Sequence, residues 1–365
     1  MHQTSDTTLT DGLISVRGND DGGRRRRRLS DANARGELLR LDRGVYVDPS
    51  LWLSAAPWTR HLLTTRAHAL TQPGAVFCRE TALSLHGFPL LRAPQYVHVR
   101  TGSRSNTGRR RAQQMVSPAV SRNVLARHED GGPQGRGLQE RDLVPPAVKK
   151  VLVAGGAGRR RRPFHRPALH LDDQGLMAES LIHVLGDTVP RMTAVESAVV
   201  LDAARSSARC GPAISQREVE EAMLPWASDA VMRRWKNAWQ LADPGAESAG
   251  ESVSRILMLE AGFQVPQTQK KIRMPDGRLV RVDFFWPEVG LIGEFDGMEK
   301  YSRSRDFSGL TPARVVEEEK VREDELRALG HRVVRWTWGQ MVHQRRLPEI
   351  LLRAGVPRPH VSRTL

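Results

Sequence analysis

The chain is poor in cysteine and in long apolar runs, and each shortage excludes a class of protein. Its 365 residues include only two cysteines, Cys78 and Cys210, which lie far apart and by themselves cannot form a disulfide framework or a four-ligand zinc site. No run approaches the ~18 to 20 consecutive apolar residues of a membrane-spanning helix. Residues 1–11 are too polar for a secretory signal. We therefore expect a cytoplasmic protein without structural zinc or a membrane span.

Basic residues outnumber acidic residues by a wide margin. The 56 Lys and Arg residues against 41 Asp and Glu residues give a net charge of +15, which favours a polyanionic partner such as nucleic acid. Only seven of the basic residues are lysines, and such a skew toward arginine can also reflect GC-rich codon usage. Arginine runs at 24–28, 109–111 and 159–162 lie among Gly, Asp and Ser residues. They mark either solvated loops or a nucleic-acid footprint.

Composition and periodicity divide the chain into six segments. These are a disordered leader (1–30), a small α+β module (31–100), an irregular region rich in Arg, Gly and Pro (101–175), a helical connector (176–245), a C-terminal domain (248–355) and a tail (356–365). The fold class that follows is α/β in the broad sense, or α+β, with a mixed sheet flanked by helices in the C-terminal domain.

The C-terminal domain shows the clearest alternation of elements. We expect a helix near 251–261, strands near 270–274, 279–286 and 291–296, and a turn at Pro275-Asp276-Gly277. A long helix follows, with Thr311 as N-cap, Pro312 at its first position and Gly330 beyond its end. A strand near 331–338 and a helix near 348–353 complete the order α-β-β-β-α-β-α.

Three carboxylates interrupt two strongly β-forming strands of this domain. Glu294 and Asp296 lie two residues apart, so they share a face of their strand. If Trp286 pairs with Leu291 across a four-residue loop, Asp283 stands opposite Glu294 at a Cβ separation of about 5 Å. A divalent cation such as Mg²⁺ or Mn²⁺ would relieve the repulsion and activate water at a phosphorus centre. The alternative is an exposed sheet face with acidic residues scattered among arginines and lysines.

Charged residues also fall on the apolar stripe of the long helix. Glu319 and Arg322 share a face with Leu326, where they either orient water, metal or phosphate or form an i,i+3 ion pair. Lys320 points more to the side of this stripe, and Lys300 lies shortly after Asp296. Both lysines are candidates for contact with phosphate.

Glu251 stands at the start of the first helix of the domain. Ser248 and Glu251 have the spacing of a capping box, in which the glutamate serves the helix end. A glutamate there can also face the sheet, so Glu251 remains a candidate site residue.

Taken in order, these residues resemble the PD-(D/E)xK superfamily, and within it the Vsr-like endonuclease domains of the very-short-patch-repair type. The resemblance rests on Glu251, on V-D-F at Asp283, on G-E-F-D-G at 293–297, on E-K-x-R-E-D-x-L at 319–326 and on R-V-V-R-W-T-W at 332–338. It covers about three tenths of the chain. It implies a restriction-endonuclease-like core that cleaves DNA with Mg²⁺, in which Asp283 and Glu294 are the metal ligands and Glu251 and Asp296 support them.

The sequence departs from this family at two points. The lysine expected two residues after Glu294 is replaced by Asp296, so its role passes to Lys300 or Lys320 or is absent. The zinc site of true mismatch-repair Vsr enzymes has no counterpart, which argues against mismatch specificity.

The N-terminal module is similar to the winged-helix region of AbiEi-type antitoxins, which bind DNA and regulate their own synthesis. The likeness spans about 30–100 and rests on R-G-V-Y-V at 43–47 and A-L-S-L-H-G at 82–87. Two hypotheses follow for the whole chain. One is a metal-dependent nuclease acting on DNA, or on RNA; the other is an antitoxin-like DNA-binding regulator that carries a degenerate nuclease domain.

Overall fold

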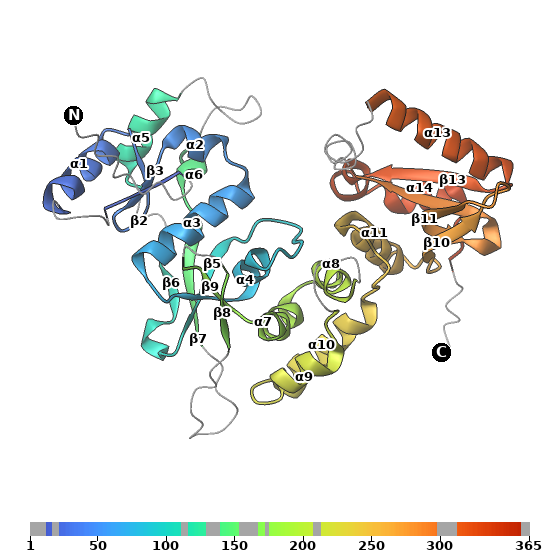
Figure 1. Cartoon of the computed structure of the whole chain (residues 1–365), viewed down its shortest axis with the longest axis horizontal. Helices are drawn as coiled ribbons and strands as arrows, with labels where there is room; N and C mark the ends of the chain where they lie inside the picture. The colour runs from blue at the N-terminus through green and yellow to red at the C-terminus, as the bar shows by residue number, and fades with distance from the viewer. Residues whose placement is uncertain are drawn as a thin grey trace. The chain divides into compact units, whose positions relative to one another are not determined.

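The computed structural model describes residues 12–16, 22–110, 116–128, 139–152, 167–171, 175–206, 213–297 and 312–358 (Figure 1). The described residues form a mixed α/β structure with three sheets, and the chain divides into two compact units. Unit 1 comprises 1–88, 92–188 and 219–228, and unit 2 comprises 89–91, 189–218 and 229–365. Among the helices that the structure describes, none combines the length and apolarity needed to cross a bilayer.

Unit 1 contains a three-stranded and a six-stranded sheet, in the orders β1-β3-β2 and β6-β7-β5-β4-β9-β8. Its strands are β1 (Leu13–Ser15), β2 (Leu39–Asp42), β3 (Val45–Val47), β4 (Val76–Phe77), β5 (Tyr96–Thr101), β6 (Gly108–Arg110), β7 (Ala147–Leu152), β8 (Ala168–His170) and β9 (Met177–Glu179). Its helices are α1 (Gly22–Ala34), α2 (Pro49–Ser54), α3 (Pro57–Thr71), α4 (Arg79–Leu85), α5 (Pro118–Arg127), α6 (Glu140–Leu143) and α7 (Leu181–Thr188), with a 3₁₀ turn at Arg104–Asn106. Helix α9 (Gln216–Met223) crosses the boundary between the units.

Two predictions for unit 1 differ from the structure. Residues 1–30 are not wholly a disordered leader, because β1 pairs with β3 and Leu13 is fully buried, while α1 includes Arg24 to Arg28. The region 101–175 contains α5, α6 and three strands, β6, β7 and β8, rather than irregular chain alone. Both segments acquire structure through pairing and packing with distant residues, which local composition does not reveal. The run at 159–162 lies outside the described residues.

Unit 2 contains one four-stranded sheet in the order β10-β11-β12-β13. Its strands are β10 (Gln267–Arg273), β11 (Leu279–Trp286), β12 (Leu291–Asp296) and β13 (Arg332–Thr337). Its helices are α8 (Ala194–Arg205), α10 (Asp229–Leu241), α11 (Ala249–Glu260), α13 (Pro312–Ala328) and α14 (Leu347–Ala354), with short turns at Val189–Arg191 and Pro287–Val289 and a π-turn at Gly339–His343. The predicted N-cap of α13, Thr311, lies outside the described residues.

The strand connections explain the sheet of unit 2. The turn at Pro275-Asp276-Gly277 joins β10 to β11, and Gly277 has a φ of +87°, which glycine adopts without strain. Strands β10, β11 and β12 are antiparallel, whereas β12 and β13 are parallel and α13 lies between them in the chain. A parallel pair needs such a crossover.

The two faces of this sheet carry separate apolar cores. On one face, Leu326 of α13 packs with Val282 and Ile292. Figure 1 shows α13 running along this sheet. The other core contains Phe284, Trp286 and Trp336, together with residues of α8, α11 and α14. The end of the sheet that carries Asp283 and Glu294 therefore has α11 on one face and α13 on the other.

Candidate active site

Strands β11 and β12 separate where the predicted carboxylates lie. Trp286 pairs with Leu291 as expected, and the register continues to Phe284 opposite Gly293, where the ladder ends. Beyond that point the Phe295 N–H donates to Oδ2 of Asp283 at 2.9 Å. The Asp283 side chain thus replaces a backbone acceptor at the opening between the strands.

Asp283 is linked to Glu251 through Gln269, which the sequence did not single out. Nε2 of Gln269 donates to Oε2 of Glu251 at 2.7 Å and lies 3.5 Å from Oδ1 of Asp283. Gln269 has a φ of +50°, an uncommon conformation for a residue other than glycine. Because the expected strand begins at 270, no pattern in the sequence pointed to Gln269, and its backbone conformation could not be read from sequence.

Glu251 both caps α11 and faces the sheet. Ser248 caps the helix as predicted, because the Glu251 N–H donates to Ser248 Oγ at 3.2 Å, but the other half of the capping box differs: Oε1 of Glu251 accepts from Ser248 Oγ at 2.7 Å instead of from the Ser248 N–H. The Glu247 N–H and Gln269 Nε2 donate to the other oxygen. Glu251 is therefore held by neutral donors while it remains close to Asp283.

Glu251 and Asp283 place two acidic groups close together at this end of the sheet. Burial raises the pKa of Glu251, and the negative charge of Asp283 raises it further against the effect of the neutral donors. In the part of the chain that the structure describes, neither carboxylate is ion-paired with a lysine or an arginine. The Glu251–Asp283 pair consequently lacks a positive charge that a cation would supply.

Glu294 is arranged differently from this pair. It is buried, and its Oε1 accepts from Nη2 of Arg322 at 3.0 Å. The same nitrogen donates to the backbone oxygen of Arg281 in β11. Arg322 thus lies between the diverging strands, and the prediction that it faces the sheet from α13 is confirmed.

Asp296 is neutralised by Arg335, a residue of β13 that the sequence did not single out. Arg335 Nη1 lies 3.0 Å from Asp296 Oδ1 and 3.9 Å from Glu319, and its Nε lies 2.9 Å from Glu323. Partial burial lowers the pKa of Arg335, but the carboxylates, led by Asp296, raise it overall. The signal in the sequence was a charged position between two apolar residues, Val334 and Trp336, in the interior of the strand.

The predicted site residues are therefore divided between two groups. Asp283 is linked to Glu251 through Gln269, whereas Glu294 binds Arg322 of α13 and Asp296 binds Arg335 of β13. A metal site shared by all three carboxylates stays a prediction. Within the described ranges, no three acidic, histidine or cysteine side chains surround a common point where a metal ion would bind. Lys320 is exposed, and Lys300 lies outside the described residues.

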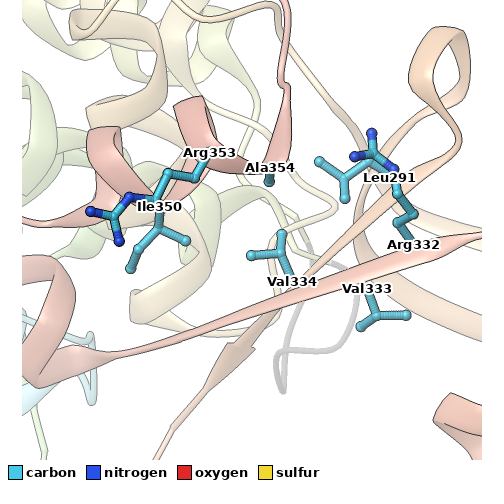
Figure 2. Close-up of a pocket in the computed structure, with 7 residues that line it drawn as sticks. All are labelled: Leu291, Arg332, Val333, Val334, Ile350, Arg353 and Ala354. Atoms are coloured by element: carbon cyan, nitrogen blue, oxygen red, sulfur yellow. The ribbon is translucent and has the colours of Figure 1, made fainter.

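A separate pocket lies between β13 and α14. It has a volume of about 380 Å³ and is lined by Leu291, Arg332, Val333, Val334, Ile350, Arg353 and Ala354 (Figure 2). These residues contribute apolar walls and two guanidinium groups but no carboxylate. The pocket is thus distinct from the acidic residues at the opening between β11 and β12.

Comparisons with known proteins give relatives without a described activity. No family model matches the chain, and no solved structure matches it. Two uncharacterized proteins of Mycobacterium tuberculosis, from strains CDC 1551 and H37Rv, are each 31% identical over 156 residues, which is 40% of this chain and 53% of the relative. The chain therefore spans about half the length of the curated relatives it matches.

Proposed function

We propose that unit 2 contains a restriction-endonuclease-like domain of the Vsr type, and that the protein hydrolyses phosphodiester bonds of DNA with Mg²⁺ or Mn²⁺. The order α11-β10-β11-β12-α13-β13 supports this, since it places acidic residues where two central strands separate. The single observation that carries the proposal is the Glu251–Asp283 pair at that opening, joined only through a neutral amide.

The residues present fit a divalent cation. Mg²⁺ commonly binds one or two carboxylates and completes its shell with waters and phosphate oxygens. Asp283 and Glu251 supply two carboxylates, and burial, together with the negative charge of Asp283, raises the pKa of Glu251. These two residues would hold the ion, which supplies positive charge beside the phosphate that is cleaved.

Arg322 is the residue placed to bind the phosphate. A guanidinium carries five N–H donors, and in this structure Nη2 serves both Glu294 and the Arg281 carbonyl. The remaining donors can form charge-assisted hydrogen bonds with phosphate oxygens. Glu294 then acts by fixing the orientation of Arg322, instead of serving as the second metal ligand that the family resemblance implies.

Nicking of supercoiled plasmid by the purified full chain tests this proposal. We expect cutting with Mg²⁺ or Mn²⁺, its loss in Asp283→Asn, and its retention in Asp276→Asn. The asparagine side chain in the first variant keeps an oxygen that can accept the Phe295 N–H, so this change removes charge rather than the hydrogen bond. Asp276 is an exposed carboxylate in the turn between β10 and β11 and serves as the matched control.

Three results of this experiment have defined meanings. Equal cutting by the wild-type chain and Asp283→Asn would reject the assigned site. Cutting of a matched RNA but not of DNA would retain the site and change the substrate. Calorimetric titration with Mn²⁺ gives a second measure, because Asp283→Asn should lose the binding heat that Asp276→Asn retains.

A second candidate function is supported by the two ion pairs beside α13. Glu294 with Arg322 and Asp296 with Arg335 leave those carboxylates already neutralised, as in a nuclease domain that has lost its chemistry. The protein would then be an antitoxin-like regulator. It would bind DNA in a salt-dependent manner, and the variant Glu294→Ala would still bind. It would not cleave DNA in the presence of any divalent metal.

A further inference from the structure

Strand β10 forms an edge of the sheet in unit 2 and is strongly basic. It is the first strand in the order β10-β11-β12-β13 and carries Lys270, Lys271 and Arg273, all exposed. These residues directly follow Gln269, the residue that links Glu251 to Asp283. The basic strand therefore begins at the candidate active site.

Two of the basic side chains share an open face of the sheet. Ile272 is buried in the core that contains Leu326 of α13. Because strand side chains alternate, Lys271 and Arg273 point to the opposite face. Their partners in β11 are Arg281 and Leu279, and both partners are exposed as well. The outer half of this hairpin thus has one covered face and one basic face in solvent.

Two residues of the basic face, Lys271 and Arg273, differ from other surface cations in unit 2 in having no acidic partner among the described residues. Arg278 binds Asp276 and Glu325, and Arg346 and Arg353 both bind Glu349. Within the described residues, by contrast, no carboxylate pairs with Lys271 or Arg273, although Arg281 pairs with Glu247. Two neighbouring cations on an open face attract an external polyanion.

The face also adjoins the carboxylate pair through direct contacts. Lys271 lies opposite Arg281, Arg281 binds the Glu247 side chain at 2.7 Å, and the Glu247 N–H donates to Glu251. A phosphate backbone that follows the basic face is therefore led toward Glu251 and Asp283.

We propose that the face formed by Lys271, Arg273 and Arg281 binds the phosphate backbone of duplex DNA and delivers it to the Glu251–Asp283 pair. This inference rests on the proposed function for the direction of delivery, but the binding itself does not depend on cleavage. Side chains two residues apart in a strand are about 7 Å apart, a spacing that suits the closely placed charges of a nucleic-acid strand.

Protection of the sheet edge is the competing explanation. Lysines on an edge strand discourage pairing with another chain. That role requires charge anywhere along the edge, whereas phosphate binding requires the charges of this face. The two explanations therefore predict different results for the same variant.

Salt-dependent binding provides the first measurement. The full chain is titrated against a fluorescent DNA duplex in EDTA, so that no cleavage occurs. We expect the variant Lys271→Gln with Arg273→Gln to lower the slope of log K against log salt by about 1.8, since each phosphate contact contributes about 0.9. The control is Arg346→Gln with Arg353→Gln, which removes the same amount of charge from α14 and from the residue just before it. This control should keep the wild-type slope.

Photocrosslinking provides a second measurement, which reports where on the protein the DNA lies. Benzoylphenylalanine is placed either at Leu279, which is 55% exposed beside Arg273, or at Leu352, which is 58% exposed on α14. We expect DNA adducts from position 279 at a yield several-fold above that from position 352, and loss of the excess in the Lys271 and Arg273 variant.

Failure of this inference can be separated from failure of the proposed nuclease. Asp283→Asn should keep the slope and the crosslink at 279 whether or not the wild-type chain cuts DNA. Equal crosslinking at 279 and 352, together with an unchanged slope in the Lys271 and Arg273 variant, would overturn the inference. Self-association of that variant, seen by light scattering with DNA binding intact, would instead assign these residues to edge protection.

Discussion

His61 shows how burial alone can set the behaviour of a residue with pH. It is 2% exposed in unit 1, and its Nε2 lies 3.2 Å from the Tyr96 carbonyl oxygen. Burial lowers the pKa of His61 to about 4, from an ordinary value of 6.5. The neutral ring is the form that the folded chain accommodates.

We expect unit 1 to lose stability as the pH falls from 6.5 to 4. In that window the unfolded chain binds the His61 proton and the folded chain does not, which costs the folded state about 3 kcal/mol in full. His61→Gln should reduce this pH dependence, and the exposed His343→Gln should not. Urea denaturation at pH 7 and pH 5 measures both. An equal dependence in His61→Gln and the wild-type chain would refute the assignment.

At the candidate site, the sequence predicted where the carboxylates lie in their strands better than it predicted which side chains they contact. The four-residue loop after Trp286 was enough to set the register of β11 against β12 from Trp286 back to Phe284, because hairpin length and strand period determine it. The partner of each carboxylate was not predictable. It depends on the long Arg322 side chain reaching across from α13 and on the unusual backbone of Gln269.

At the scale of elements, local patterns succeeded where contacts are close in sequence. The turn before β11, the cap at Ser248 and the crossover helix α13 all follow from residues a few positions apart. Strand β1 was missed because its three residues form a strand only by pairing with β3, about 30 positions away. Pairing of that kind has no local signature.

The contact between α11 and β12 makes a prediction about Gly250. A Cβ at this position would overlap the Phe295 ring, so alanine would force the helix and strand apart. We expect Gly250→Ala to destabilise unit 2 by about 1–3 kcal/mol, as overpacking does, although alanine favours helix. Gly23→Ala is the matched control, because nothing lies within 4 Å of its added Cβ and the change should be neutral or stabilising. Thermal unfolding compares them, and a stabilised Gly250→Ala would contradict the packing.

At the scale of the whole molecule, the start of the C-terminal domain was predicted too late in the chain. The predicted domain begins at 248, but the compact unit also contains 189–218 and 229–247. Val199 of α8 belongs to the same core as Phe284 and Trp336. Helical spacing in the connector predicted α7, α8, α9 and α10 but missed β9 at its start, and it could not show which helix joins which sheet.

The ion pair between α8 and α11 shows why the earlier boundary matters. Both oxygens of Asp202 accept from Arg255 Nη2, at 3.1 and 3.0 Å, and the two side chains are almost fully buried. Arg255 Nη1 also donates to the Leu241 carbonyl. Removing α8 would leave a buried guanidinium without its carboxylate, a change that typically costs about 3–5 kcal/mol.

We therefore expect a fragment of residues 189–365 to fold and a fragment of residues 229–365 to unfold at much lower urea. Asp202→Ala in the longer fragment separates the polar contacts of Asp202 from the apolar contacts of α8, because it removes the carboxylate that accepts from Arg255 and from the Asp243 N–H. It should account for about 3–5 kcal/mol of the difference, and the lost packing of Val199 for the remainder. Circular dichroism in urea measures all three. Equal midpoints for the two fragments would show that α8 is dispensable and that the domain is self-sufficient from α10 onward.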